Sequence, residues 1–450
     1  MEIIQSIFGF FIAIGILVTF HEFGHFYIAR LFNVKVLNFS IGFGKTLYKK
    51  KFHNEGTEYS VGLIPLGGYV KMLESSELDP DLDKDKHPYC FDKQSVYKRF
   101  LIVAAGPVFN LILAIIFFTI VHFSGITGMK PFVTSIDGHN LPQIEGKSFH
   151  EIVEVNGVMT QRWQDVRVEI LNIIVNKNKL NLLVKDYKNE TSLLQINYDK
   201  NILQRDGDIV VNLGLHPRKP EFPSTIGTIE NNSPASLSGL KIGDRVFSVN
   251  NQAIDSWNGL VEKIQNNANN ILKLKIDRSG EILDIILVPA TNKNSSNQSG
   301  YAGISPDQTE LNNFRILVKY PFFESFYKST LLTYDYSILT FKMIFELFTG
   351  QANMKNISGP LSIAEFSGKS LSMGFVYFAY LLAILSISLG VLNLLPIPLL
   401  DGGHLVYYML EMLTGNPVSE KFQLVAQQVG MLILFSIMIV AFYNDFARLL

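Results

Sequence analysis

The sequence contains one cysteine, Cys90, among its 450 residues, so no disulfide can form within the chain. Charged residues make up 18% of the chain, which is less than the roughly one quarter found in soluble proteins. The formal net charge is -1, and this excludes the strongly basic surface with which proteins bind nucleic acid. Hydrophobic residues, in contrast, make up 48% and include 34 phenylalanines. The composition therefore predicts a membrane protein with no nucleic-acid partner.

Four segments are long and apolar enough to cross a lipid bilayer. They comprise residues 3–32, 100–123, 375–395 and 425–442. The first segment lacks the basic start of a secretory signal peptide, since the chain begins Met1-Glu2-Ile3. It also carries a candidate active-site motif at its inner end, which cleavage would remove. We therefore interpret it as a retained transmembrane helix.

Basic residues cluster between the first two predicted spans, as in the run Lys49-Lys50-Lys51 and the pair Lys98-Arg99. By the positive-inside rule this loop is cytoplasmic. The N-terminus, the long segment between the second and third spans, and the C-terminus then lie on the opposite side. In a bacterium with two membranes, this topology predicts a protein of the inner membrane whose termini and central segment are periplasmic.

The candidate active-site motif is His21-Glu22-Phe23-Gly24-His25, which has the pattern H-E-x-x-H. Residues four apart share one face of a helix, so His21 and His25 can turn both imidazoles toward one Zn²⁺ ion. Glu22 can then act on a water molecule beside the ion. A chance match occurs in about one chain in a hundred of this composition, and ionisable groups within membrane helices are rarer still. The motif therefore predicts a zinc hydrolase whose active site lies inside a membrane.

A hydrolytic zinc ion commonly has three protein ligands and an open position for water. Asp401 is the strongest candidate for the third ligand, because two prolines and two glycines break the third span around it. A helix-capping role is the alternative for Asp401. His404 ranks second as a ligand, since it lies beyond the double glycine and is expected to open the next segment.

Asn393 precedes Asp401 by one to two turns and carries an amide that can hold the scissile carbonyl or a developing oxyanion. An interhelical hydrogen bond is the alternative role for Asn393. The string from Gly106 to Asn110 permits close approach of helices in the second span. Packing within the bundle is the default role for Asn110, and a hydrogen bond across the bundle is its alternative. We expect His122 to lie at the membrane interface far from the metal, and Cys90 to be a bystander.

Two pieces of the cytoplasmic loop, residues 38–47 and 59–72, have the short apolar alternation and the glycines of hairpin strands. They predict a small sheet that reaches toward the active site and pairs with an extended substrate by strand addition. An ordinary loop hairpin is the equally weighted alternative. The acidic piece 74–87 has the composition of a solvated linker.

The central segment contains an internal repeat. The only two tryptophans, Trp163 and Trp257, stand at the same offset from Asn156 and Asn250 in two matching strings. The second copy, residues 233–289, resembles a bacterial PDZ domain, whose open sheet edge takes up peptide ends. The first copy matches less fully, so peptide binding is expected mainly of the second.

Residues 321–350 are rich in Phe, Tyr and Leu but are interrupted by charges. This mixture favours helices on the membrane face, where aromatic rings are stable, or alternatively helices packed against the PDZ-like copies.

The sequence thus predicts a multi-pass α-helical membrane protein with four transmembrane helices, a membrane-associated β-hairpin region on the cytoplasmic side and two periplasmic PDZ-like α+β domains. The expected parts are a first membrane helix with the zinc motif (1–33), a cytoplasmic loop (34–98), a second membrane helix (99–124), two PDZ-like domains (125–220 and 221–305), an amphipathic membrane-surface region (306–370), a third membrane helix with the third ligand (371–403), and a linker with the fourth membrane helix (404–450).

Taken together, these motifs resemble those of the site-2 protease family of intramembrane zinc metalloproteases. The resemblance rests on the first-span motif, the tandem repeat and three further strings: Ala105-Gly106-Pro107-x-x-Asn110, Ser358 to Ala364, and Asn393 to Leu405. It covers nearly the whole chain.

The resemblance implies a zinc peptidase that cuts the transmembrane segment of single-span proteins already trimmed by another protease. Family substrates are an anti-sigma factor of the envelope stress response and remnant signal peptides. By position, His21, His25 and Asp401 match the zinc ligands, Glu22 the catalytic base and Asn393 the substrate-orienting residue. The expected partners are the lipid bilayer, such substrates, and peptide ends at the PDZ-like domains.

Two other classes of function remain open at this point. A metal transporter would need polar residues along a path through the bilayer, whereas the outer halves of these spans are nearly all apolar. A proteolytically silent PDZ scaffold would have no use for Glu22 between the two histidines.

Overall fold

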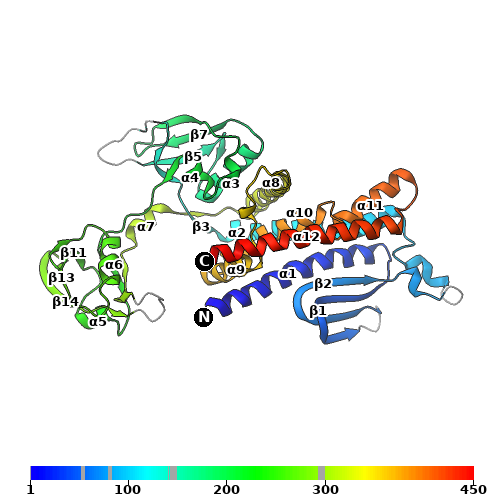
Figure 1. Ribbon diagram of the computed structural model, residues 1–450, viewed down its shortest axis with the longest axis horizontal. Coiled ribbons are helices and arrows are strands. Elements are labelled where there is room, and N and C mark those ends of the chain that lie inside the picture. Colours follow the sequence, from blue (N-terminus) through cyan, green and yellow to red (C-terminus); the bar gives the residue numbers. More distant parts are fainter. Residues whose placement is uncertain are drawn as a thin grey trace.

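The computed structural model describes residues 2–51, 56–79, 84–139, 141, 149–291 and 299–449. Four long helices run side by side, with both termini at the same end of the bundle (Figure 1). They are α1 (Glu2–Leu31), α2 (Val96–Ser124), α10 (Phe375–Leu394) and α12 (Glu420–Leu449). All four are long and apolar enough to cross a membrane, which confirms the four predicted spans.

The helices α1, α2 and α10 form the centre of the bundle. Their contacts consist of buried side chains from each helix, among them Leu17, Leu113 and Leu382. Small residues let the backbones approach: a Cβ atom on Gly390 of α10 would lie 3.1 Å from the carbonyl oxygen of Pro107 in α2. Close approach of this kind stabilises membrane helices through van der Waals packing. The helix α12 lies mostly exposed along the outside.

The two predicted hairpin pieces form one strongly bent pair, β1 (Val36–Lys51) and β2 (Glu58–Met72). Because both strands bend, Ile41 of β1 lies opposite both Val61 and Gly68 of β2. Glycines at positive φ, Gly42 at 89° and Gly44 at 83°, allow β1 to turn. The pair packs against α1, so that residue 68 lies beside the metal motif.

The predicted acidic linker contains two short 3₁₀ helices where the structure describes it, Ser75–Glu77 and Lys84–Tyr89. Cys90 follows them and is fully buried.

The central segment folds into two α+β units, each with its own hydrophobic core. The first contains β4 (Phe132–Ile136), β5 (His150–Val155), β6 (Val158–Met159), α3 (Trp163–Val175), β7 (Leu180–Lys185), β8 (Thr191–Ile196), α4 (Ile209–Asn212) and β9 (Leu215–Pro217). Its strands follow the order β8-β7-β5-β4-β9.

The second unit contains β10 (Ile226–Ile229), α5 (Pro234–Ser238), β11 (Arg245–Val249), β12 (Gln252–Ala253), α6 (Trp257–Gln265), β13 (Leu272–Arg278), β14 (Glu281–Leu287), β15 (Ala290–Thr291), β16 (Gly300–Tyr301) and β17 (Ile304–Pro306). Its main sheet has the order β12-β11-β13-β14.

The two units have the same turn geometry and the same side-chain hydrogen bond at the repeated asparagines. Asn156 and Asn250 adopt positive φ values of 49° and 50° after β5 and β11. Each side-chain oxygen accepts a backbone N–H from the next strand, Asn181 at 2.7 Å and Lys273 at 2.9 Å. The tryptophan that follows each asparagine then opens a helix, α3 or α6. The repeat seen in the sequence is therefore a repeat of structure.

A connecting region returns the chain to the bundle. It consists of α7 (Thr309–Phe314), β18 (Arg315–Val318), α8 (Phe322–Phe348), a 3₁₀ helix (Met354–Asn356) and α9 (Pro360–Met373), and β18 pairs with β3 (Ile126–Met129). In Figure 1, α8 is seen along its axis while the bundle lies across the view, so α8 crosses the end of the bundle. One face buries Ser329, Thr333 and Leu339, and the other exposes Phe323 and Tyr327. The buried face packs against α2, through Ser329 and His122, and against the first unit, through Leu339. The expected position of the exposed aromatic face on a membrane remains a prediction.

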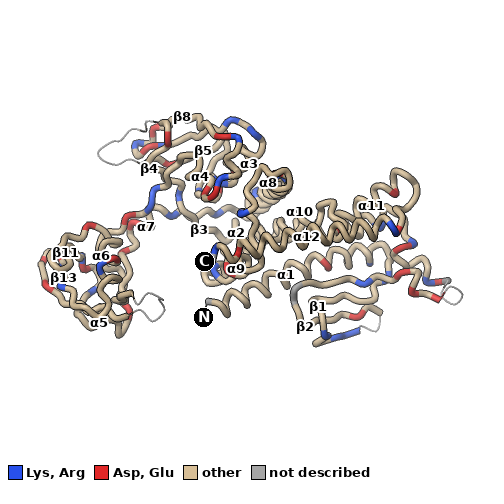
Figure 2. Tube along the Cα trace, viewed as in Figure 1, with Lys and Arg blue, Asp and Glu red and all other residues tan. Residues whose placement is uncertain are grey.

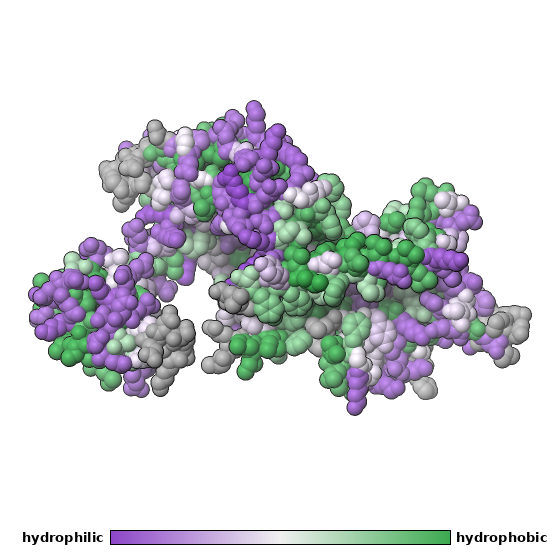
Figure 3. Space-filling view, in the orientation of Figure 1, coloured by the Kyte–Doolittle hydropathy of each residue, from purple (hydrophilic) through white to green (hydrophobic). Residues whose placement is uncertain are grey.

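Charge and hydropathy separate along the molecule. The bundle helices carry few charged residues along their length, and most charges lie on the two units and on the hairpin side (Figure 2). Apolar side chains cover much of the visible bundle, whereas the visible faces of the units are mostly hydrophilic (Figure 3).

Candidate metal centre

The H-E-x-x-H motif lies within α1 on the face that meets α2. Gly106 of α2 makes this contact possible, because a Cβ atom there would collide with Nε2 of His25 and lie 2.8 Å from Cε1 of His21. Gly24 of α1 is equally close, since its Cβ atom would lie 2.5 Å from the carbonyl oxygen of Ala105. The two helices thus approach closely at the motif, and the imidazoles occupy the space left by a missing side chain.

Asp401 reaches the histidines from the far end of α10. The helix α10 ends at Leu394, and α11 (Asp401–Thr414) begins with Asp401 itself. The helix is interrupted by the prolines, whereas Gly402 and Gly403 lie inside the first turn of α11, where their predicted role as helix breakers is wrong. They allow close packing instead: a Cβ atom on Gly403 would lie 2.6 Å from the carbonyl oxygen of Ile397.

His21, His25 and Asp401 converge on one point. Oδ2 of Asp401 lies 3.1 Å from Nε2 of His21 and 3.4 Å from Nε2 of His25, and the two Nε2 atoms are 3.3 Å apart. A tetrahedral ion with ligand bonds of about 2.0–2.1 Å requires ligand atoms roughly 3.3 Å from one another. Oδ2 is also buried and accepts no hydrogen bond from any described residue. The three ligand atoms therefore fit a zinc ion.

The other nitrogen of each imidazole is fixed by a neighbour in α2. Nδ1 of His25 donates to the carbonyl oxygen of Ile102 at 2.9 Å. Nδ1 of His21 lies 3.1 Å from Nδ2 of Asn110, whose Oδ1 is buried without a partner among the described residues. Exchanging the amide oxygen and nitrogen gives the Nδ1–H group an acceptor and satisfies Oδ1. Both histidines then present unprotonated Nε2 atoms, as metal ligands do.

Glu22 and His25 line a cavity of about 520 Å³. Residues of β2, from Tyr69 to Met72, line the cavity together with His25 and His404. The backbone of β2 approaches Glu22 closely, because a Cβ atom on Gly68 would lie 3.0 Å from its Cγ. The carboxylate of Glu22, one of the three candidate ligands and a strand edge thus share one solvent-accessible space.

The remaining sequence candidates lie outside the group of three. His404 lines the cavity one turn after Asp401, and it is not among the described residues whose ligand atoms lie within 4.8 Å of one another. Asn393 is half-buried in the last turn of α10, and no hydrogen bond to its side chain is present in the described part of the chain. His122 is buried at the other end of α2, where Nδ1 shares a 2.9 Å hydrogen bond with Oγ of Ser329.

Comparison with known proteins identifies this arrangement. Residues 9–437 match Peptidase family M50. The chain belongs to peptidase family M50, the site-2 protease family. It is 36% identical to the protease RseP of Yersinia pestis over the full length of both chains. It is 35% identical to the regulator of sigma-E protease RseP of Escherichia coli K12, with 98% of each chain covered. A Vibrio cholerae relative, 37% identical over the full length of both chains, has the words zinc metalloprotease in its name.

This M50 chain is therefore an intramembrane protease, and its family implies zinc. Sequence reasoning missed two residues of the site. Packing was the default role for Asn110, with a hydrogen bond across the bundle as the alternative, but its partner, His21 of the metal motif, was not foreseen. Gly106 was assigned to close helix approach in general, whereas it specifically accommodates the two imidazoles. The string Gly106-Pro107-x-x-Asn110 was the available signal, because a polar residue one turn after a small one in an apolar helix is rare.

Proposed function

We propose that this protein is a zinc endopeptidase that hydrolyses peptide bonds within the transmembrane segments of single-span proteins. The observation that supports the proposal is the convergence of Nε2 of His21, Nε2 of His25 and Oδ2 of Asp401 at mutual distances of 3.1–3.4 Å. These three residues would hold the ion, which when bound polarises carbonyl groups and activates water at neutral pH. The anti-sigma factor and remnant signal peptides named above are the substrates that we propose.

Glu22 acts as the general base in this proposal. It adjoins His21 in sequence and lines the same cavity as His25, so a water molecule in the cavity lies within its reach. Its carboxylate takes a proton from that water and returns it to the nitrogen of the leaving peptide. Asn110 contacts Nδ1 of His21 and so keeps the ring proton on Nδ1, which leaves Nε2 free to bind the ion. Asn393 holds the scissile carbonyl, for which its unengaged amide at the end of α10 is suited.

The substrate binds in an extended form along β2. Within the described residues, the segment 69–72 pairs only with β1, so its other edge is open toward the cavity that contains Glu22. A peptide added to that edge would bring its backbone past the carboxylate. A transmembrane helix must unwind first, because its carbonyl groups are engaged in internal hydrogen bonds.

We propose that the side of the bundle with β1, β2 and α11 is cytoplasmic and that the two α+β units are periplasmic, in the bacterial inner membrane. The basic residues of the loop between α1 and α2 support this orientation. The two units act as PDZ-like domains that engage peptide ends and restrict intact substrates. Their shared strand-helix order and asparagine turns support a common origin.

The decisive experiment compares the wild type with Glu22→Gln in zinc content and in cleavage of a model single-span substrate. Retained zinc with abolished cleavage supports the proposal. Unchanged cleavage removes Glu22 from its role, and zinc transport by a proteolytically inactive wild type would favour the transporter. Cleavage should also rise when Gly or Pro residues soften the substrate helix; equal rates would contradict unwinding as a required step.

A further inference from the structure

A second cavity, of about 310 Å³, lies where the first α+β unit meets the end of the bundle that holds both termini. It is lined by Arg162, which precedes α3, by Arg315 of β18, and by Tyr377 and Tyr380 of α10. No carboxylate is among its lining residues. Pockets for small molecules begin at about 300 Å³. Arg162 is paired with Asp165 outside the cavity, whereas Arg315 has no ion-pair partner among the described residues, so the site suits a ligand with a negatively charged group.

Arg162 is held rigidly and still has donors to offer. Its side chain is 5% exposed, and Nε and Nη2 donate to Asp165 at 3.3 and 2.7 Å. Among the described residues, none accepts a hydrogen bond from its Nη1. Gly128 of β3 leaves the room for the side chain, because a Cβ atom there would collide with Cδ of Arg162. A buried guanidinium with an open edge is a ready partner for an oxyanion.

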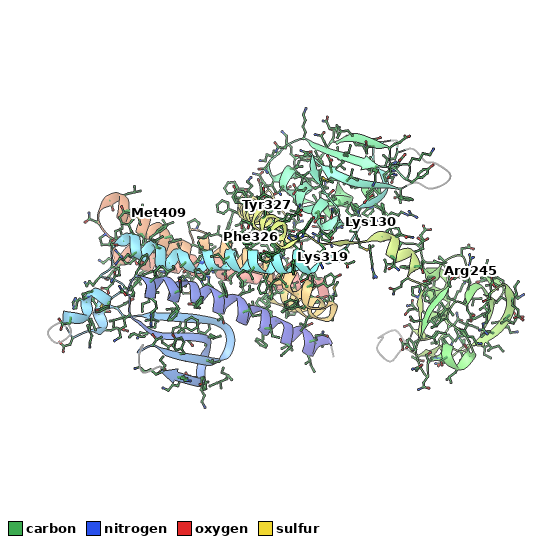
Figure 4. The ribbon with its side chains drawn as sticks, turned by 180° about the vertical axis from the view of Figure 1, so that it is seen from behind. Lys130, Arg245, Lys319, Phe326, Tyr327 and Met409 are labelled. Carbon is green, nitrogen blue, oxygen red and sulfur yellow. The ribbon has the colours of Figure 1, made fainter. Side chains whose placement is uncertain are left out.

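Basic residues lie beside the cavity on the β3–β18 ladder. The ladder, residues 126–129 and 315–318, contains Arg315 and no acidic residue, and Lys130 and Lys319 directly follow its two strands. Acidic residues, among them Asp165 and Glu324, line a separate neighbouring cavity. Arg315 is exposed, and no described residue forms an ion pair with it. Figure 4 places Lys130 and Lys319 at the end of the bundle. Arg315 is therefore available to a negatively charged ligand.

The cavity also lies level with the ends of two of the apolar membrane helices, α2 and α10. The strand β3 begins just after α2 ends at Ser124, and α10 begins at Phe375 beside the cavity. Phe375 and Met373 are 64% and 60% exposed there, as lipid-facing side chains are. Tyrosines such as Tyr377 favour the interfacial layer.

We propose that this cavity binds the headgroup of an anionic phospholipid. The phosphate would contact Nη1 of Arg162 and the guanidinium of Arg315, while the acyl chains lie outside along Met373 and Phe375. Such a lipid bridges the first α+β unit to β18 and α10, and so fixes the unit over the bundle. The proposal does not depend on proteolysis, because it concerns residues remote from the metal centre.

Native mass spectrometry of the full chain, incubated with phosphatidylglycerol or with zwitterionic phosphatidylcholine, tests the proposal. Wild type should retain phosphatidylglycerol in preference. Arg315→Gln should lower that preference about fivefold, the effect of one basic residue near an anionic surface. Arg245→Gln is the matched control: it removes the same charge from β11 of the second unit, far from the cavity (Figure 4).

A second pair of variants keeps both arginines in place. Met373→Glu puts a negative charge at the mouth of the cavity on an exposed position, so it should also lower retention of phosphatidylglycerol, whereas Met373→Gln should not. Equal retention of the two lipids by wild type overturns the proposal. So does an equal loss of phosphatidylglycerol in Arg315→Gln and Arg245→Gln, or in the two Met373 variants.

Discussion

The side-chain amide of Asn110 lies 3.1 Å from Nδ1 of His21 and links the second membrane helix to the metal centre. Asn110 is fully buried, and its backbone carbonyl accepts a 2.7 Å hydrogen bond from Oγ of Ser386 in α10. The residue thus joins α1, α2 and α10 at one point. Groups that orient a metal-bound histidine in this way set both its tautomer and its ligand strength.

Asn110→Leu should therefore weaken zinc binding about 10- to 100-fold, because His21 loses the acceptor that fixes its Nδ1 proton. Asn110→Asp should retain most of the affinity, since a carboxylate oxygen can accept the same hydrogen bond. Zinc content measured against a competing chelator distinguishes the two variants. Equal affinity of Asn110→Leu and wild type would show that the contact has no part in metal binding.

Gly106→Ala should reduce zinc content and proteolysis together. The added methyl group would occupy the position of the His25 imidazole, so either α1 and α2 separate or both histidines turn away. Gly15→Ala is the matched control on α1, because no atom lies within 4 Å of the position of its Cβ. The control should bind zinc normally and, as alanine favours helix, be no less stable. Normal zinc content in Gly106→Ala would contradict the packing described here.

Features of the fold and site that depend on local sequence patterns could be predicted from the sequence. The membrane helices follow from apolar runs of sufficient length, and the spacing of His21 and His25 follows from the helical period. The convergence of Asp401 on them was an expectation from the proline break. This convergence requires that α10 end at the same level along the bundle as the H-E-x-x-H motif in α1. The lengths of the two apolar segments are compatible with that arrangement.

Contacts between distant segments were beyond sequence reasoning. The pairing of β3 with β18 joins residues 126–129 to 315–318, and four-residue strands give little periodicity to detect. The double turn of β1 and β2 depends on Gly42 and Gly44, which a sequence shows only as generic turn residues. The partner of Asn110 could not be named, because the sequence of a single helix does not say which neighbour its polar residue faces.

The stability of the second α+β unit should depend on pH through Asp244. Burial works to raise the pKa of this carboxyl, but hydrogen bonds from Arg278 at 2.7 and 2.8 Å and from the Lys241 amide outweigh burial and hold the pKa below its usual value. A lowered folded-state pKa means that the contribution is complete above about pH 4 and is lost as pH falls through the folded-state value.

Asp244→Asn should accordingly speed hydrogen exchange of the β13 amides roughly tenfold at pH 7, and the difference from wild type should shrink below about pH 4. Exchange measured in the full chain reports on this unit separately from the bundle. Asp255→Asn on an exposed loop is the control and should change nothing. A difference between Asp244→Asn and wild type that persists unchanged below pH 3 would exclude the ion pair as its source.

A buried carboxylate on the last membrane helix holds the start of α9, beside further hydrogen bonds from Asn444 and Arg448 of the same helix. Asp445 of α12 is 2% exposed and accepts the backbone N–H groups of Gly359, Leu361 and Ser362 at 2.9, 2.9 and 3.2 Å. These groups begin α9, so Asp445 supplies the N-terminal cap that α9 lacks in its own sequence. The helix α12 makes most of its contacts with α9.

Asp445→Ala should therefore destabilise the protein by about 2–4 kcal/mol, because three backbone N–H groups and the Ser362 hydroxyl lose their acceptor at once. We expect a lower midpoint of thermal unfolding in detergent and faster proteolysis near Ser358, where the chain enters α9. Tyr443→Phe is the matched control on the same helix, since Tyr443 is 71% exposed and does not contribute to the cap. Because Asp445 is remote from Asp401, zinc content per folded molecule should stay the same in both variants. An unchanged midpoint for Asp445→Ala would show that the cap does not stabilise the protein and that the hydrogen bonds of Asn444 and Arg448 suffice to hold α12.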